Sequence, residues 1–172
     1  FDTMAIQQII VGLLVALSLT ACTNDSDSVP KSPAATSGTN IRPSNLEADG
    51  SPPETYSDEE YKQSLVCDPL SNLTKDPVLL VHGTFTYGQQ NYGATLAPLL
   101  RQRGWAVCIV TYPNRGFDDI QRTAEFVAYS VEKIAAESNR KVALIGHSQG
   151  VMQVRWAAKW WPNVQSNVSD LI

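Results

Sequence analysis

The feature that most constrains this chain is the stretch VALIGHSQG at residues 142–150. A short apolar run ends at a glycine, a serine follows two residues later, and a helical pattern begins at Val151. This order predicts a buried strand, a sharp turn and a helix, with Ser148 at the tip of the turn. In such a turn the serine backbone is strained, and Gly146 and Gly150 keep side chains away from it. We predict that Ser148 is a nucleophile; the alternative is a solvated turn serine.

Composition indicates one folded domain behind an acidic front segment. The 172 residues are 43% hydrophobic and carry a net charge of −4. Residues 23–76 hold ten acidic and four basic side chains, whereas residues 77–172 hold six acidic and nine basic ones. The positive balance of the second part is too small to indicate nucleic-acid binding, so we expect no nucleic-acid partner.

An apolar segment, IIVGLLVALSLTA, occupies residues 9–21. It is too short to span a bilayer and has the length of a signal-peptide core. A buried N-terminal helix is the alternative, but no amphipathic pattern follows. Leu19–Cys22 resembles a bacterial lipobox, although no Lys or Arg precedes the apolar core. We therefore expect residues 1–22 to direct export, yielding an outer-membrane lipoprotein anchored to the membrane at Cys22, or a secreted or periplasmic protein. Thr23, by resemblance to such lipoproteins, favours the outer membrane.

Residues 23–64 are rich in Ser, Thr, Asn, Asp and Pro. A segment of this composition buries too little apolar surface to offset the entropy of ordering it. We expect a disordered polar linker with at most a short helical turn at Glu54–Lys62. The folded domain is expected to occupy residues 65–172.

Apolar runs alternate with amphipathic patterns after residue 65. Strands are expected at Pro77–Val81, Trp105–Tyr112, Lys141–Ile145 and from Val168, and helices at Ala94–Arg103, Asp118–Ser138 and Val151–Trp161. Asp118 is expected to cap the longest helix, while Gly104 and Pro162 are expected to end the other two. Strands that alternate with helices predict an α/β fold with a doubly wound, mostly parallel sheet.

A serine that attacks an acyl group needs donors for the oxyanion that forms. The expected donors are the backbone N–H of Gln149, directly after the nucleophile, and that of Thr84, in the loop after the first strand. Gly83 permits a tight turn in that loop. His82 is interpreted as a loop residue that helps shape the oxyanion hole, with general base as the alternative.

The base and acid of a catalytic triad are not found in this sequence. The chain has two histidines, His82 and His147. The ring of His147 is expected to point away from the hydroxyl of its neighbour Ser148. In this kind of site the acid and the histidine follow the serine along the chain, and only Asp170 does so, inside an expected strand. We interpret the chain as a fragment of a longer enzyme and expect it to be inactive alone.

Cys67 and Cys108 are expected to form a disulfide, since export places the chain in an oxidising compartment. On the chain-entropy model, a bond across this separation stabilises by roughly 4 kcal/mol. Two inert buried thiols are the alternative.

Three tryptophans, Trp156, Trp160 and Trp161, follow the turn at Ser148. We expect them to pack against the sheet; the alternative is that they form a hydrophobic rim to an acyl pocket.

Taken together, these motifs resemble the lipase B family of α/β-hydrolases. The similar stretches between about Val66 and Ile172 are LVCDPL, PVLLVHGTFTYG, GWAVCIVTYP, DDIQRTAEF, the SQG turn and RWAAKWWPNVQSNVSDLI. By this resemblance, Ser148 falls on the family's nucleophile, Thr84 and Gln149 on its oxyanion hole, and Cys67 with Cys108 on its N-terminal disulfide. Two positions depart from the pattern, because His82 replaces a proline and His147 replaces a tryptophan that borders the alcohol side of the pocket.

The resemblance implies triacylglycerol lipase or carboxylesterase activity on ester or lipid substrates, through an acyl-enzyme and without a metal or cofactor. An acyltransferase or a thioesterase on the same fold is the alternative among enzymes. A non-catalytic surface lipoprotein is the alternative outside enzymes.

Overall fold

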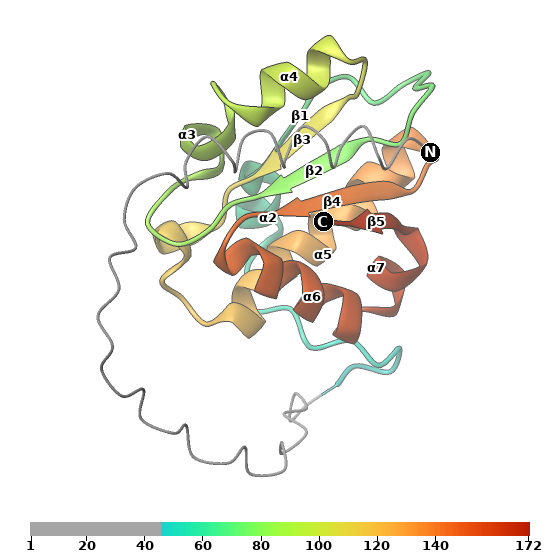
Figure 1. Cartoon of the computed structure of the whole chain (residues 1–172). Coiled ribbons are helices and arrows are strands. Elements are labelled where there is room, and N and C mark those ends of the chain that lie inside the picture. Colours follow the sequence, from blue (N-terminus) through green and yellow to red (C-terminus); the bar gives the residue numbers. More distant parts are fainter. Residues whose placement is uncertain (1–45) are drawn as a thin grey trace, which may run out of the picture. The chain divides into compact units, whose positions relative to one another are not determined.

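A computed structural model describes residues 46–172 (Figure 1). The expectations for the signal segment, for lipidation of Cys22 and for the linker up to residue 45 lie outside the described residues. Within the described range, no helix is both long and apolar enough to cross a bilayer.

The described strands form one sheet in the order β1-β3-β2-β4-β5 (Figure 1). Their bounds are β1 (Leu65–Cys67), β2 (Val78–Val81), β3 (Val107–Val110), β4 (Val142–Gly146) and β5 (Val168–Leu171). β2 to β5 run parallel, and β1 joins β3 in the antiparallel sense. β2 and β3 are buried throughout, which explains their uninterrupted apolar runs. The predicted doubly wound, mostly parallel α/β fold is confirmed.

Helices lie on both faces of this sheet (Figure 1). They are α2 (Asp58–Ser64), α3 (Gly88–Tyr92), α4 (Leu96–Gln102), α5 (Ile120–Ser138), α6 (Gln149–Trp160) and α7 (Pro162–Asn167), with a 3-10 turn, η1 (Pro113–Gly116). The path from β2 to β3 moves toward one edge, whereas the path from β3 through β4 to β5 moves toward the other. Right-handed crossovers therefore put α4 on one face and α5 and α6 on the other. The chain changes direction between β2 and β4, and ligands of open α/β sheets bind at the carboxyl ends of such strands.

The longest helix is capped by Asp119 and not by Asp118, so the expected cap is wrong by one residue. The carboxylate of Asp119 accepts the backbone N–H of Gln121 at 2.7 Å. The Asp118 carboxylate is instead bound by the side-chain amide of Asn114 in the preceding turn.

Four short elements, β1, α3, η1 and α7, were not expected from the sequence. Each is too short to show a clear hydrophobic period. Pro162, expected only to end a helix, also begins α7, because a proline suits the first turn of a helix. Gly104 does follow α4 with a positive φ of 80°, as its expected capping role requires.

The packed unit also includes residues before 65, where a polar linker was expected. Ser57 and Glu60 form a capping box that starts α2. The rings of Tyr56 and Tyr61 lie 4.5 and 5.2 Å from that of Phe126 on α5. The expected linker boundary at residue 64 therefore does not hold in the structure, because two aromatic rings in a polar stretch supply enough apolar surface to pack.

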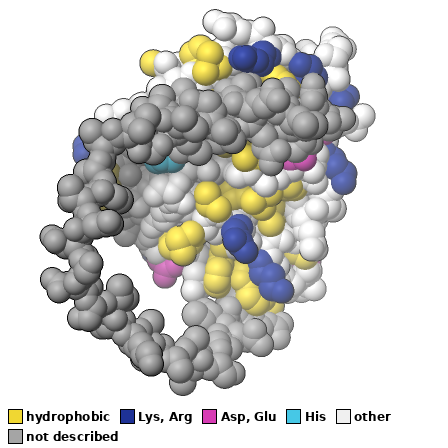
Figure 2. Space-filling view, in the orientation of Figure 1, with side chains coloured by type: hydrophobic (Ala, Val, Ile, Leu, Met, Phe, Trp, Pro, Cys, Tyr) yellow, Lys and Arg dark blue, Asp and Glu magenta, His cyan; other side chains and the backbone are white. Residues whose placement is uncertain are grey.

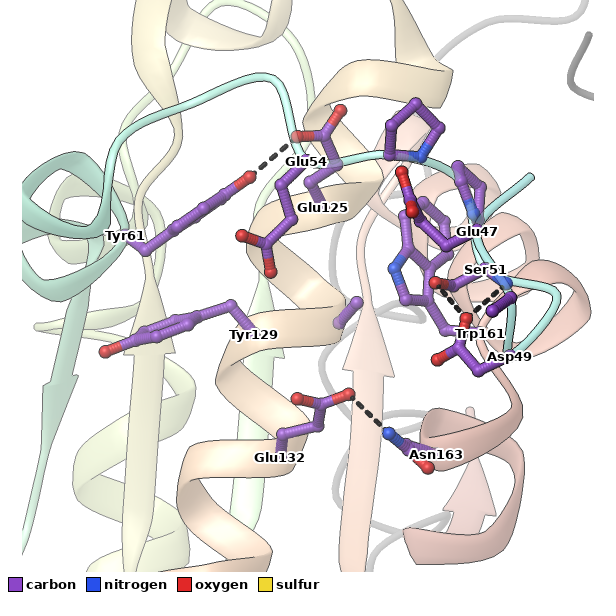
Figure 3. A pocket seen from close by; sticks show the side chains of 14 residues that line it. Glu47, Asp49, Ser51, Glu54, Tyr61, Glu125, Tyr129, Glu132, Trp161 and Asn163 are labelled. Carbon is purple, nitrogen blue, oxygen red and sulfur yellow. Dashed lines mark hydrogen bonds between the residues drawn. The ribbon is translucent and has the colours of Figure 1, made fainter. Parts of the chain in front are cut away.

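Glu125, a buried residue of α5, holds this segment in place. Its carboxylate accepts the backbone N–H of Thr55 at 2.7 Å, the Thr55 hydroxyl at 2.9 Å and the Tyr61 hydroxyl at 2.7 Å. The last of these bonds is drawn in Figure 3. Burial, and then the bond to this carboxylate, raise the pKa of Tyr61 far above its usual range, so its hydroxyl remains a proton donor.

Cys67 and Cys108 form the expected disulfide. They face each other in register on β1 and β3. The bond ties the short antiparallel edge strand to an interior strand across a sequence separation of 41 residues.

We predict that Glu125→Leu lowers the free energy of unfolding by roughly 3 kcal/mol, because the donors of Thr55 and Tyr61 lose their acceptor. Urea denaturation followed by tryptophan fluorescence measures this. Glu132→Leu is the matched control on the same helix, since Glu132 is exposed and, among residues 46–172, is bound only by Asn163. Equal stability losses in the two variants would contradict the role given to Glu125.

Candidate active site

Ser148 lies at the turn between β4 and α6, in a backbone conformation that a serine rarely adopts. Its φ is 54° and its ψ is −122°. A side chain in this region costs on the order of 1–3 kcal/mol and persists only where its surroundings enforce it. Ser148 is exposed, and its hydroxyl makes no hydrogen bond within the described residues. The residue is therefore strained and open to solvent.

Two glycines let α6 approach the sheet closely enough to enforce this turn. A Cβ on Gly150 would lie 2.3 Å from the carbonyl oxygen of Val81 and 2.7 Å from that of His82. A Cβ on Gly146 would lie 2.7 Å from the backbone nitrogen of Val151. Neither space admits a side chain, because the obstructing atoms belong to the backbone.

The loop after β2 lies directly against the turn. A Cβ on Gly83 would lie 2.9 Å from both the Cβ of Ser148 and the carbonyl oxygen of His147. The backbone N–H of His147 donates to the carbonyl oxygen of Val81 at 3.0 Å. These contacts bring Thr84, the next residue of the loop, beside Ser148.

Thr84 and Gln149 each present an unused backbone donor at this place. Neither N–H donates a hydrogen bond to any other group of residues 46–172. Gln149 is the first residue of α6, where helix geometry leaves N–H groups without an internal acceptor. The Thr84 hydroxyl donates to the side-chain oxygen of Gln149 at 3.1 Å and so connects the two residues.

His82 is completely buried and is not placed to act on Ser148. Its ring stacks on Tyr112 with centroids 3.9 Å apart, and its Nδ1 lies 2.8 Å from the carbonyl oxygen of Gly83. Burial lowers the pKa of His82 below its ordinary value, so the ring is neutral. A neutral Nδ1–H that donates to Gly83 stiffens the loop carrying Thr84, as the interpretation of His82 as a loop residue requires.

Within residues 46–172, no hydrogen bond joins the Ser148 hydroxyl to a base or an acid. No hydrogen bond joins its hydroxyl to His82 or to the exposed His147, the two histidines of the chain. Asp170 lies in β5, in register with Ala143 near the start of β4 and not with the end of that strand. Within residues 46–172, no group of three or more His, Cys, Asp or Glu side chains is arranged to hold a metal ion.

Exposed apolar side chains lie on the loops and helix that border the turn. Phe85 is 74% exposed, Phe117 is 62% exposed and Met152 is 56% exposed. The rings of Phe85 and Phe117 meet edge to face at 4.8 Å. Figure 2 shows hydrophobic side chains beside Lys or Arg on the face that carries α6. Apolar surface of this kind suits contact with an apolar ligand.

The tryptophans of α6 and its end mostly pack inward, as expected. Trp161 is 7% exposed and belongs to the hydrophobic core, while Trp156 and Trp160 are half-buried against it. Trp161 also lines a separate cavity of about 660 Å³ between residues 47–54 and helices α5 and α7 (Figure 3). None of the residues around Ser148 lines that cavity, so it is not part of this site.

Four residues behind the site were missed by the sequence analysis: Tyr112, Gly116, Thr123 and Gln153. Gly116 has a φ of 76°, and a Cβ there would lie 2.9 Å from the side-chain oxygen of Gln149. Gln153 is a fully buried polar residue. One signal was available, since Gln149 and Gln153 are spaced four apart and so share a helix face.

In a comparison with protein families, residues 76–168 fit the model described as alpha/beta hydrolase fold. The chain is 31% identical over 97 residues to lipase B of Pseudozyma antarctica. This alignment covers 56% of the chain and 28% of that lipase, so the chain spans well under half of the relative's length.

Among solved structures, that of Aspergillus fumigatus lipase B superposes with a TM-score of 0.64 at 26% identity, covering 83% of this chain and 33% of that one. A Bacillus licheniformis lipase in its mature form gives a TM-score of 0.53 at 20% identity, covering 61% of this chain and 43% of that lipase. The second similarity shows the fold alone.

We predict that Gly150→Ala destabilises the protein by about 3 kcal/mol, because the added methyl group meets two backbone carbonyl oxygens of β2 and its loop. Alanine is the better helix former, so helix propensity alone predicts the opposite sign. Gly104→Ala is the control: its positive φ strains an alanine, which the helical backbone at Gly150 does not, but nothing lies within 4 Å of its Cβ position. Urea denaturation compares the two, and a milder effect at Gly150 than at Gly104 would contradict the close approach.

A second prediction concerns acid stability. The pKa of His82 is lowered in the folded chain, so the unfolded chain takes up the proton first as the pH falls. The contribution of His82 to the free energy of unfolding is therefore fully present above the pKa of the unfolded chain, about 6.5. It is lost as the pH falls below that value, by at most about 1.4 kcal/mol per pH unit. Denaturation between pH 7.5 and 5 measures this slope. His82→Phe keeps the stacked ring and is expected to flatten the slope, whereas His147→Phe, at an exposed position, is expected to preserve it. An unchanged slope in His82→Phe would contradict the prediction.

Proposed function

The chain belongs to the α/β-hydrolase family and is lipase-B-like, and from this premise we propose that it carries the nucleophile and oxyanion hole of a serine ester hydrolase. The observation that carries the proposal is the strained, exposed Ser148 beside two unused backbone donors, those of Thr84 and Gln149. The substrate class we propose is lipid or other aliphatic esters, supported by the lipase relatives and by the apolar side chains around the turn.

In the proposed mechanism, Ser148 Oγ attacks the ester carbonyl carbon and its proton passes to a histidine base. The carbonyl oxygen becomes an oxyanion that accepts the N–H groups of Thr84 and Gln149. The C–O bond to the alcohol then breaks, and the histidine returns the proton to the leaving alcohol. Water, activated by the same histidine, releases the acid from the acyl-enzyme and restores Ser148. The positive end of the α6 dipole adds to the stabilisation of the oxyanion.

The histidine base and its acid partner are proposed to come from outside these 172 residues. His82 is buried against Tyr112, and His147 makes no hydrogen bond to Ser148. The neighbouring loop supplies donors but no proton acceptor. We therefore infer that the chain alone holds the nucleophile and the oxyanion hole but no base, and shows little or no ester turnover.

Export is proposed as the setting for this activity. The disulfide between Cys67 and Cys108 supports an oxidising compartment. The lipobox-like Leu19–Cys22 supports attachment to a membrane surface through a lipid at Cys22. Such an anchor would hold the enzyme close to insoluble esters.

The test uses the longer protein that supplies the histidine and acid. We predict that a fluorophosphonate probe labels it at Ser148, and that Ser148→Ala abolishes both labelling and hydrolysis of p-nitrophenyl esters. Mass spectrometry of the labelled peptide gives the position. Removal of a triad serine lowers kcat by about 10⁶-fold, so any residual rate is at background.

Ser71→Ala serves as the control, since Ser71 is an exposed serine outside the site. Labelling that persists in Ser148→Ala would contradict the assignment of the nucleophile. Absence of labelling in the unsubstituted longer protein would instead support a non-catalytic surface protein. Transfer of the acyl group to an added alcohol in preference to water would identify an acyltransferase.

A further inference from the structure

Gln153 is a fully buried polar side chain that the mechanism above does not use. A carboxamide has two donor hydrogens and an acceptor oxygen, and burying them without partners costs free energy. The side chain lies on the inner face of α6, one turn after Gln149. Its place behind the oxyanion hole suggests a role beyond packing.

Each end of this carboxamide has partners from other elements. Its nitrogen donates to the hydroxyl oxygen of Thr123 on α5 at 3.2 Å and to the side-chain oxygen of Gln149 at 3.4 Å. The Tyr112 hydroxyl lies 3.3 Å from its oxygen. The hydroxyl of Thr123 itself donates to the carbonyl oxygen of Asp119 at 3.0 Å, so its oxygen is left to accept from Gln153. This fixes which end of the carboxamide carries the nitrogen.

Gln153 thereby fixes the side chain of Gln149. The oxygen of Gln149 receives two donors, the nitrogen of Gln153 and the hydroxyl of Thr84. Gly116 leaves room for that oxygen, because a Cβ there would lie 2.9 Å from it. The side chain of Gln149 therefore links Gln149 to Thr84, and the backbone N–H groups of these two residues form the proposed oxyanion hole.

A second connection runs through Tyr112. Its hydroxyl, which lies near the Gln153 oxygen, donates its proton to the backbone carbonyl oxygen of His82, at the start of the loop that carries Thr84. The ring of His82 stacks on that of Tyr112. Gln153 is thus connected to both sides of the hole: to Gln149 directly, and to the loop through Tyr112.

We propose that Gln153 is a positioning residue that holds the backbone donors of Thr84 and Gln149 in place through the carboxamide of Gln149. This inference rests on the proposed function. Gln153 does not touch the reacting atoms. It restrains the spacing of the two donors, and small errors in the position of such groups reduce turnover strongly.

The variant Gln153→Leu tests this with little disturbance of the fold. The substitution nearly preserves volume, and each former partner keeps another hydrogen bond. Tyr112 still donates to His82, Thr123 still donates to Asp119, and the oxygen of Gln149 still accepts from Thr84. No buried donor is left unpaired. Gln165→Leu is the matched control, because it makes the same chemical change at an exposed site on α7.

In the longer, catalytically complete protein, we expect Gln153→Leu to lower kcat for a p-nitrophenyl ester about tenfold with KM changed less than about twofold. A double-mutant cycle separates positioning from a general structural effect. In a Thr84→Val background the bridge to Gln149 is already absent, so Gln153→Leu should then change kcat by less than about twofold. An equal loss of kcat in both backgrounds, or no loss of kcat in the protein that retains Thr84, would overturn the proposal.

A second measurement is independent of catalysis. In the 172-residue chain, ¹⁵N relaxation reports the order parameters of the Thr84 and Gln149 amides. We expect values near about 0.85 in the unsubstituted chain and near about 0.6 in Gln153→Leu. Unchanged values would refute the positioning role, even where the longer protein hydrolyses esters. Lowered values in a protein without esterase activity would leave the positioning role standing and refute the proposed function alone.

Discussion

The structure depends on one contact, the approach of the backbone at the start of α6 to the carbonyl oxygens at the end of β2. Gly150 lies at this contact, where even a methyl group would be 2.3 Å from the backbone carbonyl oxygen of Val81. Because the helix lies so close to the sheet, the chain has only two residues, His147 and Ser148, in which to turn from strand to helix. The positive φ of Ser148 is the local consequence.

The same contact decides which groups surround the serine. β2 and β4 are neighbours in the sheet but distant in sequence, and the chain reverses its direction of winding between them. The loop after β2 therefore meets the turn after β4 at the carboxyl ends of the strands. Gly83 touches Ser148, and the following residue offers its N–H beside that of Gln149. A parallel sheet with another strand order would separate these donors.

Polar side chains behind the site are arranged for stiffness and not for proton transfer. His82 is buried and neutral, and Gln153 joins α5, α6 and the loop residue Tyr112. Near the start of the same helix α5, Glu125 holds Thr55 and Tyr61 in the same way. Buried polar groups whose partners are in place rigidify a fold. The bonds of Glu125 help to explain why a stretch as polar as residues 55–64 packs onto the domain.

The sequence by itself determined the α/β class, the central strands, the turn at Ser148 and the partner cysteines, because each depends on short-range pattern: apolar runs, glycine spacing and cysteine count. It misplaced the helix cap by one residue and the start of the packed unit by several, since neighbouring aspartates look alike and two tyrosines in a polar stretch carry no period. Only the tertiary structure decided that Gly83 lies against Ser148 and that the N–H groups of residues 84 and 149 donate to no other group of the described residues. It also decided that the side chain of Gln153 donates to that of Gln149 behind them. Those relations join residues up to 65 positions apart, and no local pattern encodes which distant backbone atoms a strand order will bring together.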